Sequence, residues 1–199
     1  MRDGTIVAVG HLPDGDTRLS CFETAFKVLF QEYSFKELTV SGTRDERYLQ
    51  RAIALAQQSR AGGHHPFGCV IVTDDDQILA ESESRKERGG DATQHSELTA
   101  VKIASGKYPK ALLQRSTLYT STEPCAMCAG AIYWGGIGRV VYGLPEERLL
   151  ELTGNHPENP TLRLPCRELF ARGQRRIEVV GPLLEAEAAE IHAGFWDRL

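Results

Sequence analysis

TEPCAMCAGAIYW, residues 122–134, places two cysteines three positions apart, directly after a proline. Three interpretations of such a pair compete: a disulfide, a redox-active pair, or half of a metal site. Proline favours the first turn of a helix, and residues three apart share one helical face, so both thiols could bind the same ion. The rest of the sequence has to distinguish between these interpretations.

The overall cysteine usage weakens the disulfide interpretation. The 199 residues contain five cysteines, an odd number. Residues 1–16, MRDGTIVAVGHLPDGD, are acidic and interrupted by glycine and proline, unlike a secretory signal or a transit peptide. We therefore expect a cytoplasmic location, where disulfide frameworks are rare.

Composition predicts a folded chain that binds neither membrane nor nucleic acid as its main partner. The chain is 41% hydrophobic and 25% charged, with a formal net charge of −4. No apolar run reaches the roughly 18 residues that a membrane span needs. Domains that bind phosphates usually carry a basic surface, so the acidic balance makes nucleic acid an unfavoured partner.

Two regions are predicted along the chain. Residues 1–43 form an N-terminal extension of unknown role, in which aromatic and aliphatic side chains at helical spacing predict one amphipathic helix within 21–38. From residue 44 to 199, helical and strand-like stretches alternate. This alternation predicts a three-layer α/β/α sandwich around a mixed five-stranded sheet.

The predicted elements of the main domain follow from periodicity and turn residues. The strands are expected at 67–72, 77–82, 116–122, 138–144 and 175–182, the first two as a hairpin. Helices are expected at 43–63, 93–105, 124–134, 145–153 and 183–196, and residues 156–168 read as a proline-rich loop.

One upstream motif favours the metal interpretation of the cysteine pair. His95 is followed two residues later by Glu97, and both open a predicted helix. His95, Cys125 and Cys128 supply one nitrogen and two sulfurs, so a tetrahedral zinc ion would keep a fourth position open for water. An open position is typical of a catalytic zinc site, and Glu97 is the candidate proton shuttle.

These motifs resemble those of a known superfamily. H-S-E at 95–97 followed by P-C-A-M-C at 124–128 resembles the H-x-E…P-C-x-x-C signature of the cytidine deaminase-like superfamily. PFGCVIV (66–72), TLYTSTEPCAMCAGAIYW (117–134) and GIGRVVYG (136–143) resemble its nucleobase and nucleoside deaminase branch. That branch contains guanine deaminases and tRNA adenosine deaminases.

The resemblance covers roughly residues 45–199 and implies a zinc-dependent hydrolytic deaminase domain over 44–199. It implies that zinc-activated water attacks the amine-bearing carbon of a planar heterocycle while Glu97 carries protons to the ring and to the leaving ammonia. Trp134, Phe67, His65 and Trp196 are the candidate contacts of a flat substrate, because family members form the pocket from the corresponding segments.

Two positions depart from the family pattern. Ser96 occupies the middle of H-x-E, where alanine is usual. Ser84 lies eleven positions before the histidine, where many relatives carry an asparagine that binds the base or sugar. Ser84 remains a candidate substrate contact, but a hydroxyl cannot present the paired donor and acceptor of an amide.

The predicted substrate is a free nucleobase or nucleoside, with a guanine or guanosine ring placed first because of Trp134. Three alternatives stay open: a tRNA adenosine deaminase, a cytosine or aminotriazine deaminase, and a non-catalytic, zinc-binding structural subunit. The lack of a basic tail argues against a tRNA adenosine deaminase, and the intact ligand set argues against a non-catalytic subunit. The resemblance also implies a homodimer.

Overall fold

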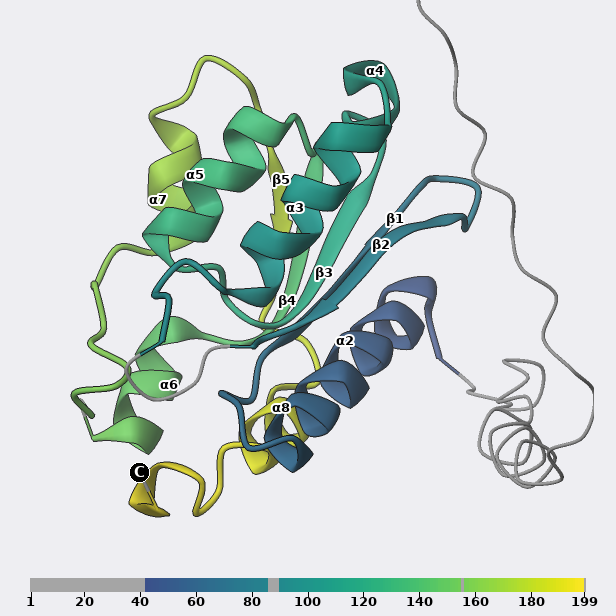
Figure 1. Ribbon diagram of the computed structural model, residues 1–199. Coiled ribbons are helices and arrows are strands. Elements are labelled where there is room, and N and C mark those ends of the chain that lie inside the picture. The colour runs from purple at the N-terminus through teal and green to yellow at the C-terminus, as the bar shows by residue number, and fades with distance from the viewer. Residues whose placement is uncertain (1–41, 86–89, 155, 199) are drawn as a thin grey trace, which may run out of the picture. The chain divides into compact units, whose positions relative to one another are not determined.

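The computed structural model describes residues 42–85, 90–154 and 156–198, which form a five-stranded sheet with helices on both faces (Figure 1). The helix predicted within 21–38 lies outside these residues, as does nearly all of the predicted N-terminal extension. Among the described residues, none of the helices has the length and apolar character needed to cross a bilayer.

The sheet is mixed, as predicted. Its strand order is β2-β1-β3-β4-β5, where β1 is antiparallel to both β2 and β3, and β3, β4 and β5 run parallel. The strands span Gly68–Val72 (β1), Ile78–Glu83 (β2), Thr117–Thr122 (β3), Arg139–Leu144 (β4) and Glu178–Val180 (β5).

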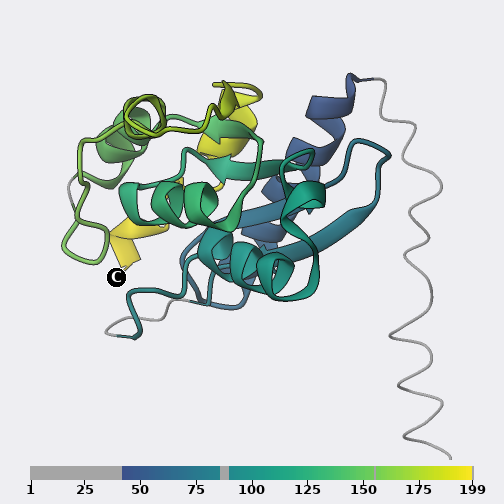
Figure 2. The ribbon, with the colours of Figure 1, turned by 90° about the horizontal axis from the view of Figure 1, so that it is seen from above.

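Helices cover the two faces of the sheet separately, which makes the predicted three layers (Figure 2). One face carries α2 (Arg44–Ala61) and α8 (Glu185–Glu190), and the other carries α3 (Ser96–Lys107), α5 (Ala126–Gly135) and α7 (Cys166–Ala171). The remaining helices are α4 (Lys110–Leu113), α6 (Glu146–Thr153) and the short 3₁₀ helix η1 (Trp196–Arg198).

Alternation along β1 divides the apolar residues into two cores. Cys69 and Ile71 point to the core under α3 and α5, whereas Val70 and Val72 point to the core under α2. All five residues of β1 are buried. A strand covered on both faces reads as a continuous apolar run, which is why its sequence shows no period of two.

Helix α2 begins and packs as its sequence indicates. Thr43 and Glu46 form a capping box, in which the Thr43 side chain accepts from the Glu46 N–H and the Glu46 carboxylate accepts from the Thr43 N–H. A Cβ at Gly68 would lie 2.5 Å from the Ala52 carbonyl oxygen, so only glycine lets β1 approach α2 this closely.

Three predicted boundaries were wrong. The last helix, predicted over 183–196, is limited to α8: Leu184, its N-cap residue, takes a positive φ angle, and the helix ends at Glu190. The proline-rich stretch at 156–168 was predicted as loop throughout, yet its last three residues begin α7. Pro124 precedes the N-cap of α5 and does not lie in its first turn.

The strand directions bring distant segments together at one end of the sheet, where the parallel strands β3 and β4 finish. Cys69 pairs with Thr120, and Thr122 pairs with Leu144, so the start of β1 and the ends of β3 and β4 lie together. The end of β2 joins them, because the Ser84 N–H donates to the Phe67 carbonyl at 2.8 Å. Ligands of open α/β sheets bind at such an edge, where parallel strands end.

At the opposite end of the sheet, a network of charged and polar side chains joins β3 and β4 to the start of α2. Arg139 on β4 donates two hydrogen bonds of 2.8 Å to the Asp45 carboxylate at the start of α2. The Tyr119 hydroxyl donates to the same carboxylate at 3.0 Å. These contacts, led by the Arg139 hydrogen bonds, hold the pKa of Asp45 below its usual value of 3.8.

We expect Asp45→Asn to lower the free energy of unfolding by about 1 kcal/mol, a small value because Asp45 and Arg139 each keep 24% exposure. Since the folded-state pKa is depressed, this stabilisation is present above roughly pH 4 and is lost as pH falls through the folded-state pKa. Urea unfolding at neutral and acidic pH measures both effects. Glu151→Gln, in an exposed pair with Arg148, is the control and should change little; equal losses in the two variants would contradict the prediction.

Candidate active site

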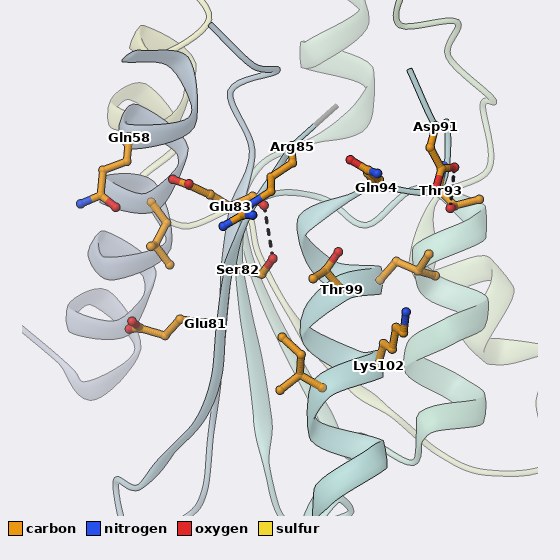
Figure 3. A pocket seen from close by; sticks show the side chains of 13 residues that line it. Gln58, Glu81, Ser82, Glu83, Arg85, Asp91, Thr93, Gln94, Thr99 and Lys102 are labelled. Atoms are coloured by element: carbon orange, nitrogen blue, oxygen red, sulfur yellow. Dashed lines mark hydrogen bonds between the residues drawn. The ribbon is translucent and has the colours of Figure 1, made fainter. Parts of the chain in front are cut away.

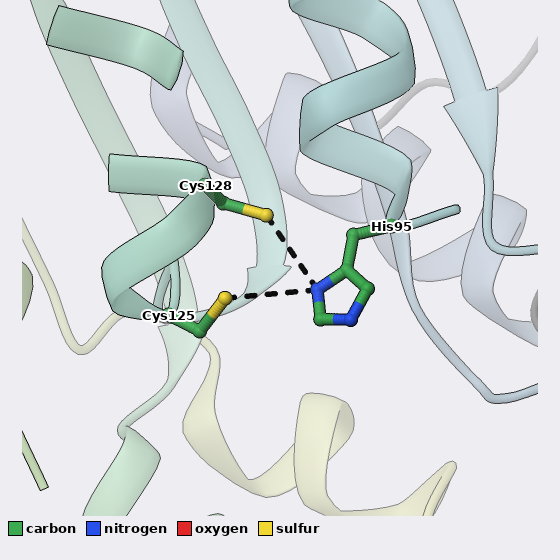
Figure 4. A group of neighbouring side chains, drawn as sticks. All are labelled: His95, Cys125 and Cys128. Carbon is green, nitrogen blue, oxygen red and sulfur yellow. Dashed lines mark hydrogen bonds between the residues drawn. The ribbon is translucent and has the colours of Figure 1, made fainter. Parts of the chain in front are cut away.

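Three side chains with metal-binding atoms meet at the edge where β3 ends. His95 is the N-cap residue of α3, Cys125 is the N-cap residue of α5, and Cys128 lies in the first turn of α5. Figure 4 shows the His95 imidazole pointing at both thiols. The structure therefore brings together the three ligands predicted from the sequence, across about thirty residues of intervening chain.

The distances in this cluster fit a tetrahedral zinc ion. The His95 Nδ1 atom lies 3.6 Å from each of the two Sγ atoms, and all three atoms lie within 4.8 Å of one another. Zinc bonds of about 2.3 Å to sulfur and 2.0 Å to nitrogen at tetrahedral angles would separate such atoms by roughly 3.5 Å. The donor set and its spacing both fit zinc, with one position left for a non-protein ligand.

The surroundings of Cys125 favour a thiolate at that residue, whereas the contact with Cys125 and burial raise the pKa of Cys128. The neighbouring Cys128 thiol and the His95 ring lower the pKa of Cys125. The N-terminal end of α5 adds the partial positive charge of its unpaired N–H groups. A buried negative sulfur needs a positive partner, which a bound metal ion would supply.

Glu97 lies beside this cluster and is buried, with 5% exposure. Its Oε2 atom accepts from the Ser96 hydroxyl at 2.9 Å and lies 3.8 Å from the Cys128 sulfur. Its Oε1 atom accepts from the Thr120 hydroxyl at 3.1 Å. Burial raises the pKa of Glu97, which suits a carboxyl group that takes up and releases a proton.

Sequence reasoning missed the two hydroxyls that orient Glu97. Ser96 had been noted only as a departure from alanine, and Thr120 only as a strand residue. Thr120 could have been found from alternation along β3, since Cys69, its pairing partner, faces the same core as α3. The contact between Ser96 and Glu97 depends on side-chain rotamers, which the sequence does not indicate.

A buried carboxylate also organises the loop that follows. Glu123 has 7% exposure, and its two oxygens accept the backbone N–H groups of Glu146 and Cys166 at 3.2 and 3.0 Å. It thereby ties the starts of α6 and α7 to the segment that carries Cys125. Glu146 is a further carboxyl group close to the cluster. Its burial and the nearby Cys125 raise its pKa to about 7.

The predicted aromatic contacts gather at the same edge of the sheet. The Trp196 ring lies 5.2 Å from His65 and 6.3 Å from Phe67, measured between ring centroids. Figure 1 shows the C-terminal segment at the end of the sheet where α3 and α5 begin. His192 and Phe195 complete the aromatic cluster.

Ser84 links this aromatic cluster to the metal ligands. It is fully buried, and its hydroxyl donates to the backbone carbonyl of Gln94, the residue before His95, at 3.4 Å. Its own carbonyl accepts from Ser59, which also donates to the His65 carbonyl. Ser84 therefore lies where the sequence placed a substrate contact, and its hydroxyl faces the backbone that carries His95.

Trp134 does not join the cluster. It lies at the other end of α5 from Cys125 and is 78% exposed. It borders a separate hollow with Val101, Tyr108 and Lys110. Its role as a substrate contact stays a prediction.

A cavity of about 760 Å³ opens between α2, β2 and α3. Figure 3 shows that its lining mixes acidic side chains, such as Glu83 and Asp91, with basic ones, such as Arg85 and Lys102. None of the three cluster ligands lines it, and neither does Glu97. This cavity is therefore distinct from the candidate active site.

We expect the protein to bind about one zinc ion per chain, and Cys125→Ala to lose it, because two remaining ligands cannot hold a tetrahedral ion. Metal analysis after dialysis measures the stoichiometry. Cys166→Ala is the matched control, since this buried thiol lies outside the cluster and its removal should leave the zinc bound. Equal zinc in Cys125→Ala and the natural protein would rule the cluster out as the site.

Comparison with known proteins agrees with this geometry. The model of the cytidine and deoxycytidylate deaminase zinc-binding region matches residues 42–144. A probable cytosine deaminase of Schizosaccharomyces pombe is 46% identical over 154 residues, which cover 77% of this chain and 93% of that protein. The guanine deaminase of Bacillus subtilis is 43% identical over 98 residues, covering 49% of this chain and 62% of that one.

A solved structure from a study of A-to-I editing by tRNA:A34 deaminases superimposes with a TM-score of 0.56 at 25% identity, covering 73% of this chain and 99% of that one. The matched family region contains all three ligands and Glu97. The chain therefore belongs to the cytidine and deoxycytidylate deaminase zinc-binding family, within the cytidine deaminase-like superfamily, and zinc is the metal its cluster would hold.

Proposed function

We propose that this protein is a hydrolytic deaminase of a free nucleobase, with cytosine as the first candidate. The observation that carries the proposal is the buried Glu97 carboxyl group beside a three-ligand zinc cluster, at the sheet edge where the aromatic cluster lies. Zinc, when bound, would lower the pKa of a water molecule and so supply the nucleophile.

The protein's own residues would orient the substrate and move protons. Glu97 is held by Ser96 and Thr120, so its carboxyl group cannot turn away from the cluster. Because burial raises its pKa, Glu97 can accept the proton of the attacking water, pass it to a ring nitrogen and then assist departure of ammonia. The flat faces of Phe67 and Trp196 suit a planar heterocycle.

Two features support a free base over a nucleoside. Trp196 has 4% exposure and His65 has 2%, so the aromatic cluster is shielded from solvent, as suits a small planar base. Ser84 also turns its hydroxyl to the Gln94 carbonyl. It lacks the amide that would bind a ribose with a paired donor and acceptor.

Cytosine comes first because the match to the probable cytosine deaminase extends well beyond the family region, over nearly all of that relative. Guanine, placed first from the sequence, is the second candidate. Its support came from Trp134, and that side chain is exposed at the far end of α5. A match to guanine deaminase over half of the chain keeps it in the test.

The first test is ammonia release by the zinc-loaded protein from a panel of substrates: cytosine, isocytosine, guanine, adenine, their nucleosides, an aminotriazine and a tRNA anticodon stem-loop. We expect release from cytosine and little from cytidine. Release from guanine alone would transfer the proposal to the second candidate. Release from the stem-loop alone would make the protein an RNA-modifying enzyme, and silence with zinc bound would favour a structural subunit.

In the same assay, Glu97→Gln should reduce turnover by roughly 10²-fold or more, because the amide cannot carry a proton. Zinc should remain bound, since Glu97 is not one of the ligands. Near-normal turnover in Glu97→Gln would exclude the proton-carrying role. Glu123→Gln, a change from carboxylate to amide just before α5, is the control, and we expect it to lose stability before it loses proton transfer.

We also propose that the protein is a homodimer that uses the outer face of α3 and α5. Ile103, Met127 and Trp134 are large apolar side chains exposed on these two helices. Large apolar side chains that stay exposed can mark interaction surfaces. Light scattering after size exclusion should give a dimer that Trp134→Glu dissociates, with Leu162→Glu, an exposed leucine elsewhere, as the control; a monomeric natural protein would refute this.

A further inference from the structure

The C-terminal segment contains a hydrogen bond between two aromatic rings. Trp196 donates its indole N–H to the Nδ1 atom of His192 at 3.3 Å. The two ring planes are nearly parallel, with 5° between them and 6.1 Å between the ring centroids, so the rings lie edge to edge as an in-plane hydrogen bond requires. Because His192 accepts through Nδ1, its proton must lie on Nε2.

This arrangement leaves a buried donor unused. His192 has 2% exposure, and its Nε2 atom has no hydrogen-bond partner within the described residues. Burial, with the nearby Arg60 charge, lowers the pKa of His192 to about 3, so the ring is neutral at ordinary pH. An unpaired buried N–H destabilises the folded chain, and an apolar ring of the same shape would avoid that cost.

The backbone on both sides of His192 is held from α2. Arg60 donates to the carbonyl of Ile191 at 2.5 Å and to the carbonyl of Ala193 at 2.8 Å. The guanidinium group thus bridges two carbonyls more than 130 residues away in the sequence. A planar fork of donors can do this, whereas a lysine ammonium would reach them poorly.

The Trp196 indole that these residues hold lies against His65 and Phe67, at the sheet edge of the zinc cluster. The Phe67 carbonyl accepts a hydrogen bond from the Ser84 N–H, and the Ser84 hydroxyl donates to the carbonyl of Gln94, the residue before His95. The indole therefore lies at the same end of the sheet as the zinc cluster, where the proposed function places the substrate.

We propose that His192 is a positioning residue, which fixes the Trp196 indole against the base in the active site, and that Arg60 clamps the segment that carries it. The inference rests on the proposed function, because it assigns these two residues to the substrate slot of that activity. It accounts for a buried histidine at this position, because phenylalanine would leave the Trp196 indole N–H without an acceptor.

The kinetic test compares His192→Phe with His192→Asn. Phenylalanine keeps an aromatic ring but removes the acceptor, whereas asparagine places its Oδ1 atom near the former position of Nδ1. We expect His192→Phe to raise KM for the deaminated base by roughly threefold to tenfold, the value of one neutral hydrogen bond, with kcat changed less. His192→Asn should recover most of this loss.

Thermal unfolding separates positioning from simple packing. His192→Phe removes the unpaired N–H of His192 but leaves the buried Trp196 indole N–H without its acceptor, so its Tm should stay close to that of the natural protein. A lower Tm with an unchanged KM would make His192 a structural residue and overturn the proposal. Arg60→Met should raise KM in the same direction as His192→Phe, and Arg148→Met, at an arginine exposed on α6, is its control.

Fluorescence tests the position of the indole without any turnover. In a Trp134→Phe background Trp196 is the single tryptophan, and its 4% exposure predicts weak quenching by acrylamide. Quenching should increase with His192→Phe and much less with His192→Asn. Equal quenching in both would overturn the positioning role, and increased quenching with an unchanged KM would remove Trp196 from the substrate slot. If no base is deaminated, the proposed function fails, and this measurement still decides whether His192 holds the indole.

Discussion

The close approach of one imidazole and two thiols, at the N-terminal ends of two different helices, is the constraint on which the rest of this structure depends. His95 and Cys125 are both N-cap residues, so their positions are set by where α3 and α5 begin. A ligand set with 3.6 Å spacing requires these two helix starts to meet, and the core beneath α3 and α5 supplies the packing that holds them there.

One end of the sheet stabilises the scaffold, and the other end forms the candidate active site. At one end, the Arg139 and Asp45 pair joins β4 to the start of α2, which stabilises the scaffold. At the other end, buried polar groups surround the zinc cluster, and each is oriented by a neighbour: Glu97 by Ser96 and Thr120, and the starts of α6 and α7 by Glu123. Buried polar groups at this end cost stability unless paired, so their pairing keeps the site rigid.

The C-terminal segment is the part of the site that lies furthest away in the sequence. Arg60 on α2 binds the backbone carbonyls of Ile191 and Ala193, and Gly194, beyond the end of α8, takes a positive φ angle that turns the chain. A continuous helix over 183–196, which the sequence predicted, would carry the aromatic residues along one straight axis. The turn at Gly194 instead returns Trp196 against His65 and Phe67.

The sequence by itself predicted the fold class, the first hairpin and the three ligands His95, Cys125 and Cys128, because their chemistry and spacing are local signals carried by two short motifs. It also named Glu97, which the structure places beside the ligands. Only the tertiary structure decided which other side chains belong with them. Strand register brings Thr120 to Glu97, a hydrogen bond joins His192 to Trp196, and Arg60 binds carbonyl groups more than 130 residues away in the sequence. No periodicity in the chain encodes such contacts. Trp134, by contrast, is close to Cys125 in the sequence but far from it in the structure. About nine residues of helix separate the two along the axis of α5, since each residue advances the axis by about 1.5 Å.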